Sequence, residues 1–93
     1  FDYCLKLEKV DLSSFDTSKV EDMYSMFNGC EKLKTIFASD SFVTQNVEDS
    51  EYMFNYCLKL VGGNGTTYDN DFRDHTYACI DTPEQKGYFT MKA

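Results

Sequence analysis

The chain has 93 residues and a formal net charge of −7, and 42% of its residues are hydrophobic and 16% aromatic. These values predict one small folded domain and argue against disorder. The negative charge disfavours nucleic acid and anionic lipid as partners, because both require clustered Lys and Arg. No apolar run approaches the length of a membrane span, so we expect no membrane insertion in this segment.

Two segments of the chain are similar to each other. Residues 15–33 (FDTSKVEDMYSMFNGCEKL) align with residues 42–60 (FVTQNVEDSEYMFNYCLKL) at an offset of 27, with eleven identities in nineteen positions. Upstream of these segments the offset is 26, which pairs Cys4 with Cys30. Because the chain begins within this pattern, we expect an exposed edge at its N-terminal side and possible self-association through that edge.

Each unit is predicted to contain a short strand followed by a short helix. In LEKVDLSSF, the residues Leu7, Val10 and Leu12 have the spacing of a leucine-rich-repeat strand that points alternate side chains inward. In KVEDMYSMF, apolar residues recur three and four apart, which predicts one buried face of a helix. Ser18 and Glu21 have the separation of a capping box at its start. The apolar residues of this first helix are Val20, Met23, Met26 and Phe27.

Residues 61–93 are predicted to close the array of residues 1–60 within the same single domain. The glycines of VGGNG mark a chain reversal. TYACI and GYFTM are predicted to be two short strands separated by a turn. The expected fold class is therefore α/β: a short leucine-rich-repeat-type solenoid, with a strand and a short helix in each coil, closed by a C-terminal β cap.

Three of the four cysteines occupy one position of the repeat. Cys4, Cys30 and Cys57 are expected to stack as small buried residues, together with the core aromatic residues Phe27 and Phe54. These five residues are interpreted as structural. Oxidation of one cysteine pair stays open, because neighbouring rungs of such a stack fall near the separation that a disulfide requires.

No catalytic residue, cofactor site or metal site is expected, and the protein is not predicted to be an enzyme. The cysteines include no C-x-x-C pair, and His75 is the single histidine. Asp69, Asp71 and Asp74 resemble the start of a calcium loop, but the central glycine and the distal glutamate are missing, so a solvated loop is expected. The sequence has no nucleophile elbow, phosphate-binding loop or HExxH motif.

The segments LEKVDLSSFDTSKVEDMYSMFNGCEKL and LVGGNGTTYDNDFRDHTYACIDTPEQKGYFT resemble the BspA-like leucine-rich repeat family of bacterial surface proteins and lipoproteins. The resemblance covers nearly the whole chain and implies the C-terminal end of such an array. It implies an exported protein that is extracellular or attached to the cell surface, as an adhesin or a binder of host proteins. The chain departs from the family pattern at Cys79, where a basic residue is expected, and in the strand near residues 37–40.

The leading hypothesis for function is a non-catalytic recognition module that binds an extracellular or host protein. A structural spacer without a partner of its own is the alternative. An exposed aromatic patch on the strand face would favour binding, whereas a uniformly polar face would favour the spacer. The candidate contact residues on this face are Glu8, Lys9, Asp11, Ser13, Lys34, Thr35 and Phe37.

Overall fold

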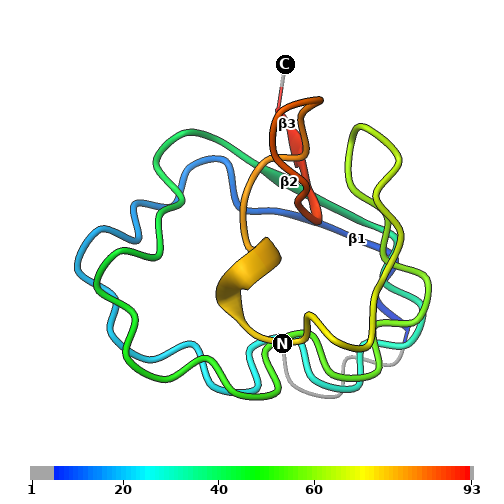
Figure 1. Ribbon diagram of the computed structural model, residues 1–93, viewed down its shortest axis with the longest axis horizontal. Coiled ribbons are helices and arrows are strands. Elements are labelled where there is room, and N and C mark those ends of the chain that lie inside the picture. Colours follow the sequence, from blue (N-terminus) through cyan, green and yellow to red (C-terminus); the bar gives the residue numbers. More distant parts are fainter. Residues whose placement is uncertain (1–5, 93) are drawn as a thin grey trace.

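Three short strands form one open parallel sheet (Figure 1). The computed structural model describes residues 6–92. In it, β1 (Lys9–Asp11), β2 (Thr35–Ala38) and β3 (Phe89–Met91) lie in that order. Ile36 of β2 pairs with Val10 of β1 and Phe89 of β3, and the side chains of this row face the core. The short strand predicted in the first unit is confirmed as β1.

The two similar segments lie side by side as successive turns of the chain. Figure 1 shows the first segment in blue to cyan and the second in green following the same path. The backbone N–H groups of Met23 and Phe27 donate to the carbonyl oxygens of Asp49 and Met53, each at 2.7 Å. Asp22 and Asp49 form an isolated parallel bridge. Equivalent positions of the two segments are therefore neighbours in space.

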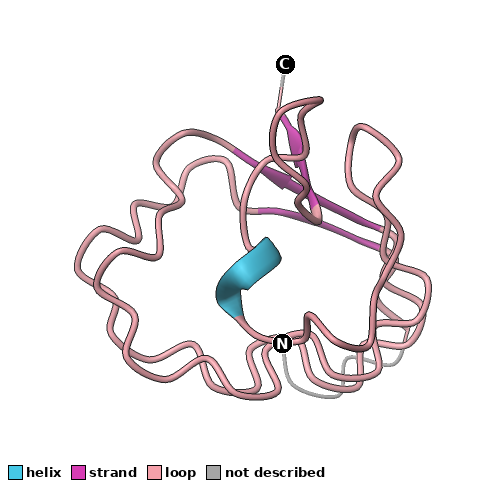
Figure 2. Cartoon of the chain, viewed as in Figure 1, coloured by secondary structure: helices cyan, strands magenta, loops and turns pink. Residues whose placement is uncertain are grey.

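The predicted α/β fold class, a leucine-rich-repeat-type solenoid with a helix in each coil and a β cap, is wrong. Residues 6–92 contain no α-helix, and their one helical segment is the 3₁₀ turn η1 (His75–Tyr77). Figure 2 shows loops and turns where the two short helices were expected. The regular structure of residues 6–92 consists of the open three-stranded sheet and η1.

The backbone of the first segment explains why the expected helix does not form. Alternate N–H groups, such as those of Met23 and Phe27, are bonded to the second segment, so an i to i−4 ladder within the first segment is interrupted. Ser25 and Gly29 have positive φ values of 54° and 78°, which end each tight turn before a helix can continue. Successive four-residue turns bring apolar residues inward every three or four positions, as a helix does. Spacing alone cannot distinguish the two structures.

The C-terminal segment contributes the third strand of the same sheet and no separate β cap. GYFTM contains β3, as predicted, and β3 pairs in parallel with β2. TYACI was predicted to be a strand, but it contains the end of η1 and a bend, and of its residues only Ile80 pairs with β3, through an isolated parallel bridge to Phe89. The side chain of Asp74 caps η1 by accepting a hydrogen bond from the backbone N–H of Thr76 at 2.9 Å. This local cap competes with an extended conformation.

Aromatic side chains join the two segments to the C-terminal segment. The rings of Phe27 and Phe54 stack with centroids 5.7 Å apart and planes 8° apart. Phe54 also contacts Tyr88 edge to face, with centroids 5.1 Å apart. All three are fully buried. The Tyr88 hydroxyl donates to the carbonyl oxygen of Phe72 at 2.9 Å, so this buried polar group is satisfied.

Asp81 ties the glycine-rich turn to the segment that precedes β3. Asp81 is buried, with 7% of the residue exposed. Oδ2 accepts the backbone N–H groups of Asn64 and Thr66 at 2.9 and 3.0 Å, and Oδ1 accepts the Thr66 hydroxyl and the Gly87 N–H at 2.7 and 3.2 Å. Burial by itself raises the pKa of this carboxyl, but the hydrogen bonds from Thr66, Asn64 and Gly87 outweigh it and lower the pKa overall.

The described cysteines of the repeat lie in the core. Cys30 and Cys57 are fully buried, and the Cys57 thiol donates to the carbonyl oxygen of Phe27 at 3.1 Å. No disulfide joins Cys30, Cys57 and Cys79 to one another. Cys4, and the N-terminal edge through which self-association was expected, lie outside the described residues.

The cysteines should differ in their reactivity toward iodoacetamide. Burial, with a smaller contribution from the neighbouring Cys30 thiol, raises the pKa of the Cys57 thiol to about 12. Because the thiolate is the reactive form, Cys57 should resist alkylation of the folded protein near pH 8, whereas the half-buried Cys79 should be modified first. Peptide mapping by mass spectrometry measures the order. Equal rates before unfolding in urea would contradict this placement of Cys57.

Candidate protein-contact surface

The outer face of the sheet collects four of the predicted contact residues. Lys9 pairs with Thr35, and Asp11 pairs with Phe37, so the two pairs form adjacent rows of one face. The alternate residues of β2, Ile36 and Ala38, point the other way and are fully buried. Thr90 of β3 continues the row of Asp11 and Phe37. The sheet therefore brings residues of both repeat units and of the C-terminal segment onto one surface.

The other three predicted residues lie at the ends of these strands. Glu8 and Lys34 precede β1 and β2 and line a groove of about 660 Å³ together with the exposed Leu58. Ser13 follows β1, and its backbone N–H donates to Asp11 Oδ1 at 2.9 Å. The predicted set is therefore split between the outer face of the sheet and its two borders.

Lys92 belongs to this surface, although the sequence pattern did not indicate it. Its Nζ lies 3.3 Å from Asp11 Oδ2 and 5.2 Å from the centroid of the Phe37 ring. Its backbone N–H donates to the carbonyl oxygen of Ala38 at 3.0 Å, which positions the side chain beside β2. Hydrogen bonds from Ser13 lower the pKa of Asp11 to about 2, with a smaller contribution from Lys92. Asp11 is therefore ionised across the physiological range.

Ser50 and His75 form a contact that sequence analysis did not predict. Ser50 Oγ lies 2.7 Å from His75 Nδ1, within the range of a nucleophile and its base. The same Oγ also accepts the backbone N–H of His75 at 3.1 Å, and Ser50 is buried. No residue in the described part of the chain is hydrogen-bonded to His75 Nε2. We interpret the pair as an anchor that holds η1 against the second segment.

The acidic loop does not gather into a metal site. Asp69 Oδ1 accepts the backbone N–H of Asp71 at 2.9 Å, and Asp74 caps η1. Across residues 6–92, no group of three or more His, Cys, Asp or Glu side chains is arranged to hold a metal ion. The Asp69 and Asp74 carboxylates therefore accept hydrogen bonds from nearby backbone N–H groups.

The fold and this surface define a small repeat protein whose two similar segments are stacked and share a sheet with the C-terminal strand. A protein-family model described as "Mycoplasma protein of unknown function, DUF285" matches residues 1–77, and the chain belongs to this family. Searches of curated proteins and of solved structures found no match to the chain. In residues 6–92 no helix has the length and apolar character that crossing a membrane requires.

Proposed function

We propose that this chain is a non-catalytic recognition module of an exported, surface-attached protein, and that it binds an extracellular protein through the outer face of its sheet. The resemblance of the repeats and of the TYACIDTPEQKGYF segment to BspA-like surface proteins supports the compartment. It also supports an adhesin-like role.

The arrangement of Asp11, Phe37 and Lys92 is the observation that carries this proposal. A partly exposed aromatic ring stands in the middle strand, with an anionic and a cationic side chain beside it. Protein interfaces combine a central aromatic anchor with a polar rim in this way. The surrounding Lys9, Thr35 and Thr90 complete a mixed polar border, the composition expected of a non-obligate contact.

Replacing Phe37 with threonine should weaken binding by at least about tenfold, because truncation of a central anchor removes a large share of binding energy. Threonine keeps the strand propensity of the position. The labelled protein would be applied to an array of purified extracellular proteins, and the affinity of each bound protein measured by biolayer interferometry.

Phe15→Thr is the matched control, because Phe15 is also an exposed phenylalanine but lies outside the strands. It should leave the affinity unchanged within about twofold. If no extracellular protein binds in a manner that depends on Phe37, the recognition hypothesis fails and the structural spacer becomes the better hypothesis.

A further inference from the structure

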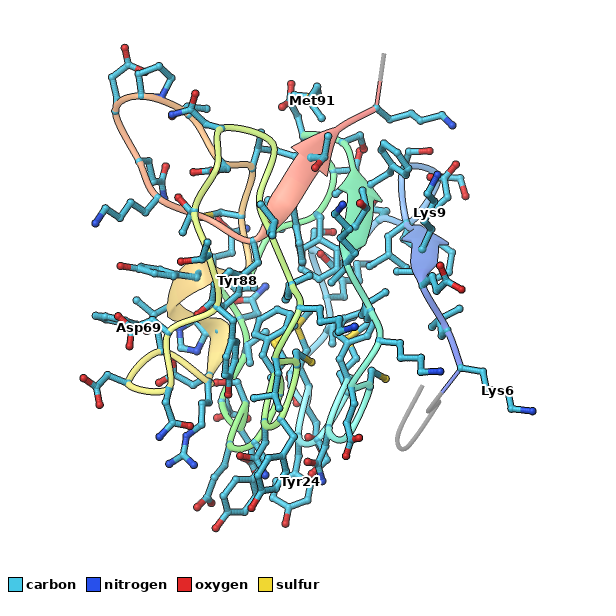
Figure 3. The ribbon with its side chains drawn as sticks, turned by 90° about the vertical axis from the view of Figure 1, so that its right-hand side faces the viewer. Lys6, Lys9, Tyr24, Asp69, Tyr88 and Met91 are labelled. Carbon is cyan, nitrogen blue, oxygen red and sulfur yellow. The ribbon has the colours of Figure 1, made fainter. Side chains whose placement is uncertain are left out.

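Three tyrosines are exposed at the turns of the two segments, away from the sheet. Tyr24, Tyr52 and Tyr56 are 50%, 38% and 58% exposed. The rings of Tyr24 and Tyr52, one from each segment, meet edge to face with centroids 5.9 Å apart. Figure 3 shows Tyr24 at the end of the molecule opposite Met91. The pair forms a small aromatic patch that no described residue covers.

The backbone at Tyr52 and Tyr56 indicates that the fold does not require a tyrosine at either position. Tyr52 and Tyr56 have φ values of 60° and 63°, in the left-handed region that bulky residues rarely adopt. The equivalent residues of the first segment are Ser25 and Gly29, which have the same backbone sign. The same turns therefore form with small residues, and a tyrosine at a strained position is better explained by a function of its side chain.

Several carboxylates lie beside Tyr52, on one side of the patch. Tyr52 borders a hollow of about 420 Å³ whose lining includes Arg73 and five carboxylates. Arg73 Nη1 donates to Asn55 Oδ1 at 3.2 Å. The carboxylates are those of Glu48, Asp49, Glu51, Asp71 and Asp74. Within residues 6–92, the single salt bridge joins Asp11 to Lys92, so none of these five has an ion-pair partner there.

We propose that Tyr24 and Tyr52, with the carboxylates of this hollow, form a second docking surface that binds a Lys- or Arg-rich segment of a partner protein. Tyrosine rings attract ammonium and guanidinium groups through their faces, and the carboxylates provide the complementary charge. A cationic partner also relieves the repulsion between like charges such as Asp22 and Asp49, which pair directly across the two segments. Polyanionic partners are disfavoured at this surface for the same reason.

Binding of a fluorescein-labelled peptide of alternating arginine and serine, measured by fluorescence anisotropy, tests the proposal. Tyr24→Ser/Tyr52→Ser should weaken binding about tenfold, because two exposed cation–π contacts are lost together. Tyr52→Ser introduces the residue that the first segment already carries at this position, so the turn is retained. Thermal unfolding by circular dichroism checks that the variant is folded.

Two double variants with the same change in charge distinguish binding at this surface from attraction to the net charge of the protein. Glu51→Gln/Asp71→Asn removes two carboxylates of the hollow, and Asp40→Asn/Glu84→Gln removes two exposed carboxylates that do not line it. The first pair should weaken binding several-fold and reduce its salt dependence, and the second should change it less than about twofold.

Equal losses for the two charge variants, or unchanged binding after loss of both tyrosines, would overturn the proposal in favour of unspecific attraction. Sedimentation velocity of the protein alone provides a further check. Self-association that disappears in the tyrosine variant would show that the patch binds a second copy of the chain. That result would overturn the proposal of a separate cationic partner.

Discussion

Replacing Asp81 with alanine should lower the free energy of unfolding by about 3–4 kcal/mol, because several buried donors lose their acceptor at once. The carboxylate accepts four hydrogen bonds from Asn64, Thr66 and Gly87. It thereby joins the glycine-rich turn to the residues that precede β3, and no disulfide links these two parts of the chain. Urea unfolding followed by tyrosine fluorescence measures the change. Asp40→Ala, at an exposed turn, should change stability by less than about 0.5 kcal/mol. A similar small effect at Asp81 would contradict the role of this contact.

The contribution of Asp81 should also depend on pH. Because the pKa of this carboxyl is lower in the folded than in the unfolded protein, its stabilisation is fully present above the unfolded value of about 4 and is lost as the pH falls through the folded value. Asp11 and Asp74 also have lowered pKa values, so the wild-type curve alone does not isolate Asp81. The difference in stability between wild type and Asp81→Asn should therefore shrink below about pH 4. A constant difference down to pH 2 would contradict this assignment.

Phe54→Ala should lower the free energy of unfolding by about 3–5 kcal/mol, which is a large fraction of the stability of a domain of this size. Phe54 is fully buried between Phe27 of the first segment and Tyr88 of the C-terminal segment. Its removal leaves a cavity where the three parts of the core meet. The same urea titration measures the effect.

Phe15→Ala is the control for this substitution, because Phe15 is 45% exposed and should lose about 1 kcal/mol or less. Phe54→Leu should lie between the two, since it keeps most of the buried apolar volume. If Phe54→Ala and Phe15→Ala were equally mild, the aromatic stack would not be the centre of the core.

The sequence repeat predicted which residues are neighbours better than it predicted their secondary structure. The alignment places Phe27 with Phe54 and Asp22 with Asp49, and both pairs are in contact in the structure. The same alignment predicted a helix in each unit, but the N–H groups of Met23 and Phe27 bond to the second segment. A repeat in sequence identifies equivalent positions, whereas the choice between local and inter-segment hydrogen bonds depends on what lies beside the chain.

The candidate contact surface was predicted only in part. Alternation in the strands placed Lys9, Asp11, Thr35 and Phe37 together, because side-chain direction in a strand depends on local backbone geometry. Lys92 was missed, because nothing local links it to Asp11 or Phe37. The exposure of Tyr24 and Tyr52 was also not predicted, because the helical spacing was used to identify buried positions and did not include these two residues.

By itself, the sequence determined the repeat, the strand near Val10, the strand of GYFTM and the inward positions of Phe27, Phe54, Cys30 and Cys57. These features follow from the spacing of apolar residues along the sequence, because that spacing indicates which side chains point into the core. Only the tertiary structure decided that the turns replace helices, that β3 adds to β2 in parallel, and that Asp81 collects four donors. Each of these depends on hydrogen-bond partners that are distant in sequence, and local composition does not specify where such partners lie.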